Sequence, residues 1–188
     1  MNKKKIIVAI LVILTLLAVI VVNYNNKKSL QNNDKKVEDK VEDKTEDGEK
    51  KVDDRIEAID FKLEDLQGKE IKLSDFKGKK VFLNFWASWC GPCKAEMPHM
   101  QQLYEETKDK DIVILAVNVG EDKDKVKSFI EENKYAFPVV LDIKQEAALQ
   151  YGISAFPTSF FIDEEGYVYS GIRGAMSLDM MKEQLKLK

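Results

Sequence analysis

The chain has 188 residues, 44% of them hydrophobic, a formal net charge of -3, two cysteines and one histidine. Two cysteines are too few for the disulfide framework of a small secreted domain, and together with one histidine they fall short of the four ligands of a structural zinc site. Residues 55–188 are net acidic and offer no basic surface to a phosphate backbone, so we expect no nucleic-acid binding.

The N-terminal segment predicts a membrane anchor. Residues 1–5 contain three lysines and are predicted to form a basic tip on the cytoplasmic side; in residues 6–22, only Thr15 is not apolar. Seventeen helical residues span about 25 Å, which suffices for a short transmembrane helix. The alternative is a cleaved signal peptide, but the run exceeds the usual apolar core of about 7 to 15 residues and no Ala-x-Ala-like site follows it. The lysine tip predicts a signal-anchor that places the rest of the chain outside the cytoplasm.

Residues 23–54 predict a disordered linker. Eighteen of these 32 residues are charged, with the two signs nearly balanced. A four-residue repeat places like charges at positions i and i+4, which disfavours a helix. Because almost nothing there is apolar, the linker has no core to bury.

The remaining residues, 55–188, predict one compact domain in which strands alternate with helices. The predicted strands are residues 61–66, 71–76, 80–86, 112–119, 137–141, 158–162 and 168–172. The predicted helices are residues 91–108, 124–133, 145–151 and 177–187. The first two strands flank a Gln-Gly-Lys turn and predict a hairpin. This order predicts an α/β fold with a mixed sheet and helices on both faces, with the chemistry at the strand-to-helix switch at residues 89–91.

The two cysteines stand at that switch. Cys90 and Cys93 are three residues apart at the start of a helix, which brings both sulfurs to one face within bridging distance. The helix N-terminus favours the thiolate of Cys90, and Pro92 is tolerated in the first turn. A zinc site lacks ligands, a covalent haem site would need a histidine where the chain has Lys94, and an inert disulfide closing so short a loop would stabilise little. The pattern therefore favours a redox-active pair.

The residues around the pair resemble a known family. Residues 81–93 read Val-Phe-Leu-Asn-Phe-Trp-Ala-Ser-Trp-Cys-Gly-Pro-Cys, and Pro98 follows five residues later. Residues 151–163, with Pro157, resemble the cis-proline segment of the thioredoxin fold. The single anchor, the leading hairpin with residues 73–79, and the additional helix and strand over residues 124–141 are similar to the TlpA/ResA-like branch of membrane-anchored thiol-disulfide oxidoreductases. The resemblance covers residues 59–188.

This resemblance implies a thioredoxin-like fold with an N-terminal hairpin and a central αβ insertion. It implies that Cys90 attacks substrate disulfides, that Cys93 resolves the product, and that a cis Pro157 presents backbone groups to an extended substrate. The chain departs from cytosolic thioredoxins, which carry a buried Asp at the position of Asn84 and a Lys near Ala116. Its candidate proton acceptor is Glu96, the acidic residue typical of the TlpA/ResA-like branch.

Other side chains complete the expected site and core. The expected substrate-binding residues around the sulfurs are Trp89, Gly91, Pro92, Phe156 and Pro157. Phe85 and Trp86 are expected in the core, Pro98 at a helix kink, and His99 on an exposed helix face.

The resemblance implies a reductase of partner-protein disulfides, with no bound cofactor and no metal. A membrane thiol-electron carrier of the CcdA/DsbD kind would recharge it, and an apocytochrome c is one expected client. The alternatives are an extracytoplasmic disulfide oxidase or isomerase, against which the Gly-Pro dipeptide argues, and a thioredoxin-fold metal-delivery protein, for which the cysteine spacing is wrong.

Overall fold

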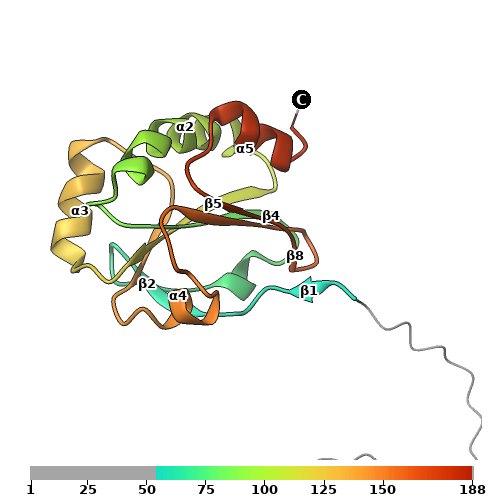
Figure 1. The fold of residues 1–188 in the computed structure, drawn as a ribbon, viewed down its shortest axis with the longest axis horizontal. Helices are drawn as coiled ribbons and strands as arrows, with labels where there is room; N and C mark the ends of the chain where they lie inside the picture. The colour runs from blue at the N-terminus through green and yellow to red at the C-terminus, as the bar shows by residue number, and fades with distance from the viewer. Residues whose placement is uncertain (1–53, 188) are drawn as a thin grey trace, which may run out of the picture. The chain divides into compact units, whose positions relative to one another are not determined.

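The computed structural model describes residues 54–187, which contain one mixed eight-stranded sheet (Figure 1). Its strands are β1 (Ile56–Glu57), β2 (Lys62–Asp65), β3 (Glu70–Lys72), β4 (Lys80–Trp86), β5 (Ile112–Val119), β6 (Val139–Asp142), β7 (Thr158–Ile162) and β8 (Tyr167–Arg173). The order across the sheet is β1-β8-β7-β4-β5-β6-β2-β3. Strands β4, β5 and β6 are parallel, and β7 runs antiparallel beside β4.

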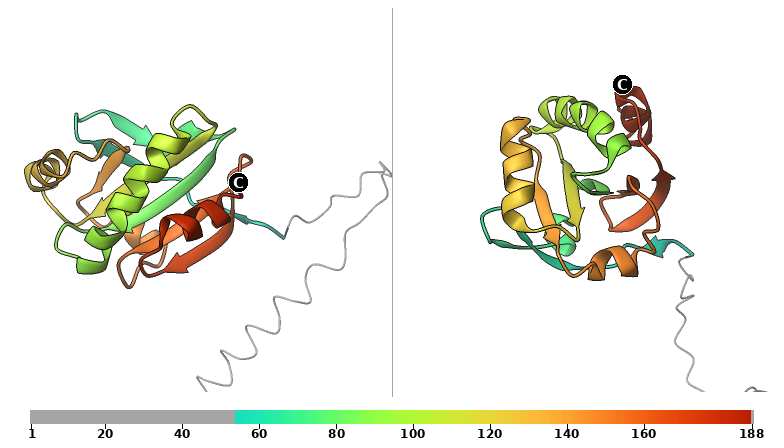
Figure 2. Two further views of the ribbon diagram at one scale, coloured as in Figure 1. Left: turned by 90° about the horizontal axis from the view of Figure 1, so that it is seen from above. Right: turned by 60° about the vertical axis from the view of Figure 1, so that its left-hand side comes forward.

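Helices cover both faces of this sheet. They are the 3₁₀ helix η1 (Leu73–Phe76), α2 (Gly91–Thr107), α3 (Lys123–Glu132), α4 (Glu146–Gln150) and α5 (Leu178–Gln184). Helices α2, α3 and α5 share one core cluster, whereas α4 and η1 share the other. Seen from above, α2 and α5 lie side by side over the sheet (Figure 2). The predicted α/β architecture is therefore confirmed for the described residues.

Alternation along β4 assigns its side chains to the two cores. Phe82 and Trp86 face the cluster of α2, while Leu83 and Phe85 face the cluster of α4. Trp86 and Phe85 have no exposed surface, as predicted. Because every second side chain of a strand points to the same face, Asn84 lies on the face of Phe82 and Trp86. Its polar side chain therefore points toward α2.

The hairpin prediction is right in kind but wrong in length. Its second strand ends at Lys72, and Leu73–Phe76 form η1 instead of continuing the strand. The Asp75 carboxylate accepts a hydrogen bond from the backbone N–H of Lys72, and the Asp60 carboxylate accepts one from that of Ser74. These side-chain contacts satisfy the first turn of η1 and compete with strand pairing. Strand β1, which pairs with β8, was not predicted.

The predicted basic tip and anchor, and residues 23–53 of the predicted linker, lie outside the described residues. Within residues 54–187, no helix is both long enough and apolar enough to cross a bilayer.

Candidate functional site

Cys90 and Cys93 form a disulfide at the junction of β4 and α2, so the predicted bridging distance is confirmed. Cys90 is the N-cap of α2, and its sulfur accepts a hydrogen bond of 3.1 Å from the backbone N–H of Cys93. The positive end of the helix dipole therefore points at the Cys90 sulfur. Cys90 is 5% exposed and Cys93 only 1%, so Cys90 is the more accessible of the two.

A groove runs beside the disulfide. The peptide bond between Phe156 and Pro157 is cis, as the resemblance implied. Trp89 is 64% exposed and meets Phe156 edge-on, with ring centroids 5.8 Å apart. The groove is lined by Trp89, Cys90, Gly91, Pro92, Gln145, Ile153, Ser154, Ala155 and Phe156. Of the expected substrate-binding residues, the structure thus places Trp89, Gly91, Pro92 and Phe156 along this groove. Pro157 is buried and does not line it.

Glu96 lies one helical turn beyond Cys93 and is almost completely buried. Its Oε1 accepts a hydrogen bond of 2.8 Å from Asn84 Nδ2, and its Oε2 accepts one of 2.7 Å from the backbone N–H of Met176. Burial raises the pKa of Glu96 to about 7, although the hydrogen bonds from Met176 and Asn84 oppose the rise. The carboxyl group is therefore poised to exchange a proton near neutral pH.

His99 contacts the same backbone segment, at Met176, as Glu96 does. It was expected on an exposed helix face, but it is half-buried, and its Nδ1 lies 3.3 Å from the backbone carbonyl of Met176. One peptide segment is thus held by α2 from both sides, at its N–H by Glu96 and at its C=O by His99. Pro98 is exposed inside α2, and the helix continues through it to Thr107.

A second buried carboxylate, Glu121, holds the loop before Cys90 and was missed in the sequence. It accepts hydrogen bonds from the backbone N–H of Ser88 (2.6 Å), the Ser88 hydroxyl (2.7 Å) and Asn118 Nδ2 (2.8 Å), and it pairs with Lys125 at 2.7 Å. Burial opposes ionisation, but the hydrogen bonds from Lys125, Asn118 and Ser88 together lower the pKa of Glu121 to about 2. The signal was an acidic residue two positions after the end of a buried strand that is parallel to β4.

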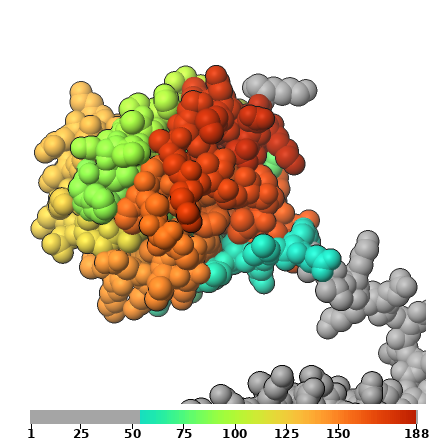
Figure 3. Space-filling model, viewed as in Figure 1, coloured from blue at the N-terminus to red at the C-terminus, as the bar shows by residue number. Residues whose placement is uncertain are grey.

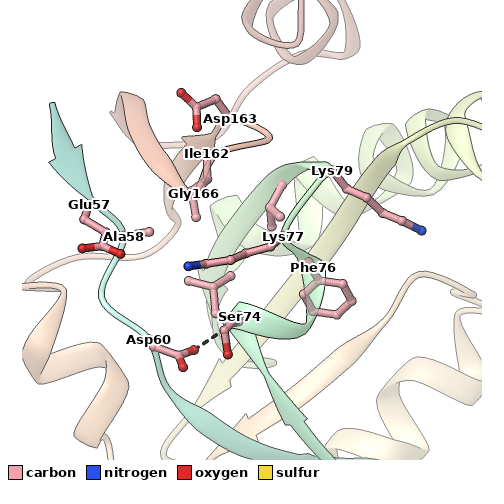
Figure 4. Close-up of a pocket in the computed structure, with 12 residues that line it drawn as sticks. Glu57, Ala58, Asp60, Ser74, Phe76, Lys77, Lys79, Ile162, Asp163 and Gly166 are labelled. Atoms are coloured by element: carbon pink, nitrogen blue, oxygen red, sulfur yellow. Dashed lines mark hydrogen bonds between the residues drawn. The ribbon is translucent and has the colours of Figure 1, made fainter. Parts of the chain in front are cut away.

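A separate cavity of about 200 Å³ lies at the opposite end of β4. Lys77, directly after η1, extends across it, and the hydrogen bond from the backbone N–H of Ser74 to Asp60 borders it (Figure 4). Neither cysteine lines this cavity. Within residues 54–187, no three His, Cys, Asp or Glu side chains are grouped so that they could hold a metal ion.

Comparisons with known proteins point to the same chemistry. Residues 55–170 match the AhpC/TSA family. The thiol-disulfide oxidoreductase ResA of Bacillus thuringiensis subsp. konkukian is 44% identical over 138 residues, which are 73% of this chain and 80% of that protein.

Comparison with solved structures also finds thiol-disulfide oxidoreductase and thioredoxin relatives. The crystal structure of StoA from Bacillus subtilis superimposes with a TM-score of 0.61 at 35% identity, covering 68% of this chain and 96% of StoA. The exposed lipoprotein thioredoxin Etrx1 of Streptococcus pneumoniae gives a TM-score of 0.61 at 34% identity, covering 69% of this chain and all of Etrx1.

The raised pKa of Glu96 predicts a pH-dependent stability. A carboxyl whose pKa is about 7 when folded and about 4.5 when unfolded holds its proton more tightly in the folded state. Its contribution to the free energy of unfolding is therefore greatest below pH 4.5. This contribution, at most about 3 kcal/mol, is lost as the pH rises to 7. Glu96→Gln, which cannot ionise, should become more stable relative to the parent protein over this range. Urea unfolding of the oxidised proteins between pH 4.5 and 7.5 measures this, with Glu105→Gln on the exposed face of α2 as control. A parent-to-variant difference that stays constant with pH contradicts the expectation.

The contacts of Glu121 predict a stabilisation that is lost at acid pH, whereas that of Glu96 is lost toward neutral pH. Glu121→Gln leaves donors of Ser88 and Lys125 without their carboxylate, and should lower the free energy of unfolding at pH 7 by about 2 to 4 kcal/mol. Because the folded pKa is about 2, the stabilisation is complete above pH 4.5 and is lost as the pH falls toward 2. Urea unfolding at pH 7 and pH 3 should show a smaller effect at pH 3. Glu131→Gln, an exposed change on α3, serves as the control, and equal stability of parent and Glu121→Gln at pH 7 refutes the assignment.

Proposed function

Because the chain belongs to the AhpC/TSA family and, within the thioredoxin fold, to the TlpA/ResA-like thiol-disulfide oxidoreductases, we propose that it reduces disulfides of partner proteins outside the cytoplasm. The observation that carries the proposal is the Cys90–Cys93 disulfide, held at a helix N-terminus with Cys90 as its more accessible sulfur. Residues 55–188 form the catalytic domain in this proposal.

The compartment follows from the N-terminal sequence. Residues 6–22 anchor the protein as one transmembrane helix, residues 1–5 stay in the cytoplasm, and residues 23–54 tether the domain to the outer face. A fully extended linker of 32 residues reaches about 110 Å, so the domain can search for clients near the membrane. The exposed lipoprotein among the structural neighbours is consistent with such a location.

The reaction is a two-step thiol-disulfide exchange. In the reduced protein, the Cys90 thiolate attacks one sulfur of a client disulfide, forms a mixed disulfide and releases the other client sulfur as a thiolate. Cys93 then loses its proton and attacks the Cys90 sulfur, which releases the second client thiolate. The client gains two electrons, and the Cys90–Cys93 disulfide seen in the structure is regenerated.

Glu96 is the proposed acceptor of the Cys93 proton. Cys93 and Glu96 are three residues apart on α2 and therefore lie on the same face of the helix. With a pKa of about 7, Glu96 is partly ionised at neutral pH and can accept a proton without remaining permanently charged in the core. Asn84, which replaces the buried Asp of cytosolic thioredoxins, instead donates a hydrogen bond to Glu96.

The client chain is proposed to lie along the groove beside Trp89, Gly91, Pro92 and the segment before Pro157. Within residues 54–187, the backbone groups of Ser154 and Phe156 make no hydrogen bond, so this segment can pair with an extended client strand. The electron donor is proposed to be a membrane thiol carrier of the CcdA/DsbD kind, and apocytochrome c is one candidate client. The chemistry requires no bound cofactor.

The midpoint potential of the Cys90–Cys93 couple tests the direction of the reaction. For the full chain in detergent, equilibrated against defined thiol buffers, we expect a value near that of thioredoxin, about -270 mV. A value near -120 mV identifies a disulfide donor and would favour the alternative, an oxidase. Purification of the reduced protein with a bound metal would instead favour metal delivery.

Three substitutions test the assigned roles. Cys93→Ser should trap a mixed disulfide between Cys90 and a client, whereas Cys90→Ser should trap none.

Glu96→Gln should slow release of the client from the mixed disulfide by about 10- to 100-fold near pH 7.5 and abolish the rise in rate near pH 7. Rapid-quench measurements between pH 5 and 8 provide the readout, with Glu105→Gln as the matched control. Equal rates for the parent and Glu96→Gln at every pH exclude Glu96 as the proton acceptor.

A further inference from the structure

A buried serine on β7 belongs to the hydrogen-bond network of Glu96. Ser159 is the cross-strand partner of Asn84 on β4, and both side chains are buried. The Asn84 amide uses both of its N–H groups: one donates to Ser159 Oγ at 2.9 Å and the other to Glu96 Oε1 at 2.8 Å. Ser159 is thus connected to Glu96 through Asn84.

The neighbour of Asn84 on its other side provides no such contact. On β5, the residue paired with Asn84 is Ala116, whose side chain forms no hydrogen bond. Among residues 54–187, the buried Asn84 Oδ1 has no donor. A buried oxygen without a donor is costly and calls for an explanation. Within this part of the chain, Ser159 is the only hydrogen-bond partner that holds the Asn84 amide independently of Glu96.

The C-terminal segment shields this network from bulk water. Helix α5, in the red segment of Figure 3, packs against the green segment that contains α2. Glu96 on α2 and Met176, on the loop before α5, are both almost completely buried. In such a low-dielectric environment, a hydrogen bond to a carboxylate is stronger than it is in water. Loss of one donor therefore shifts the balance between the protonated and the ionised form of Glu96.

Uncharged donors control the protonation of Glu96. In the described structure, Glu96 makes no ion pair, and the two groups that donate to it are an amide side chain and a backbone N–H. The strand residues at this position, on β4, β5 and β7, are an asparagine, an alanine and a serine. The titratable and charged residues of the elements packed against Glu96 make no hydrogen bond to it; they are Cys93, His99, Arg173, Asp179, Lys182 and Glu183.

We propose that Ser159 is a positioning residue of the reaction: it holds the Asn84 amide so that one N–H stays on Glu96 and keeps this carboxylate able to accept a proton at neutral pH. This inference rests on the proposed function and adds to it the residue that regulates its proton acceptor. The hydrogen bond from Asn84 lowers the pKa of Glu96, against the rise caused by burial. Without the Ser159 hydroxyl, the amide can turn away, the carboxylate loses this donor, and the pKa of Glu96 rises further.

Titration of Glu96 itself tests the proposal. Carbon NMR of labelled glutamate carboxyl groups is followed with pH in the oxidised full chain in detergent, and the signal that disappears in Glu96→Gln belongs to Glu96. Ser159→Ala, Ser159→Val and Asn84→Ala should each raise the midpoint of this signal, whereas Ser159→Thr should keep it. Valine and threonine have nearly the same shape, so this pair separates the hydroxyl contact from packing. Ser170→Ala, on the neighbouring strand β8, is the control.

The kinetics provide a second readout. Ser159→Ala should slow release of the client from the mixed disulfide about two- to fivefold at pH 7. Its rate should approach that of the parent protein at higher pH, where Glu96 is ionised in both. Because Ser159 acts through Asn84, Ser159→Ala should have no further effect in the Asn84→Ala or Glu96→Gln background. A general loss of structure would instead slow the release at every pH and in every background.

Three results overturn the proposal: equal midpoints in Ser159→Ala, Ser159→Val and the parent protein, a rise in Ser159→Thr as large as that in Ser159→Val, or an effect of Ser159→Ala that persists in the Asn84→Ala background. Failure of the parent protein to reduce client disulfides would refute the proposed function instead. The carboxyl titration does not depend on that activity, so the two failures are distinguished.

Discussion

Three parallel strands end at the same edge of the sheet, and the site depends on this convergence. The chain leaves β4 through Ser88 and Trp89 to Cys90, leaves β5 through Gly120 to Glu121, and leaves β6 through Asp142 to α4. Since β7 is antiparallel to β4, its first residue follows Pro157 at this edge as well. Groups that are distant in sequence thus meet because of strand direction alone, and short side-chain contacts fix their final positions.

The sequence was sufficient to predict the fold class, most of the elements and the positions of the cysteines. Continuous apolar strands such as Lys80–Trp86 and Ile112–Val119 have few alternatives, and Cys-Gly-Pro-Cys at a strand-to-helix switch is a specific signal. The errors occurred where tertiary contacts overrule local pattern. Residues 71–74 alternate as a strand does, but Asp60 and Asp75 stabilise a helical turn over residues 73–76. Strand β1 is two residues long and exists only because β8 offers it an edge.

The site contacts were harder to predict, because they join residues separated by tens of positions. Glu121 lies 33 residues from Ser88, and Met176 lies 80 residues from Glu96. No local periodicity encodes such pairs, although the rule that parallel strands end at one edge could have placed Glu121 near Ser88. His99 was assigned to an exposed surface because the loop that covers it, between β8 and α5, has no sequence feature that reveals its path.

Glu96 and Glu121 show how one residue type acquires two opposite properties within this site. Both carboxylates are buried, so the cost of removing charge from water is present in each case. Glu121 accepts four hydrogen bonds, one of them from a lysine, and these outweigh that cost and hold it ionised. Glu96 accepts only two, both from uncharged groups, so the cost prevails and the pKa rises. A group that stays charged can position a loop but cannot exchange protons near pH 7, whereas a group with a pKa near 7 can. The number and charge of the donors therefore distinguish the carboxylate that supports the loop before Cys90 from the one that is suited to serve Cys93.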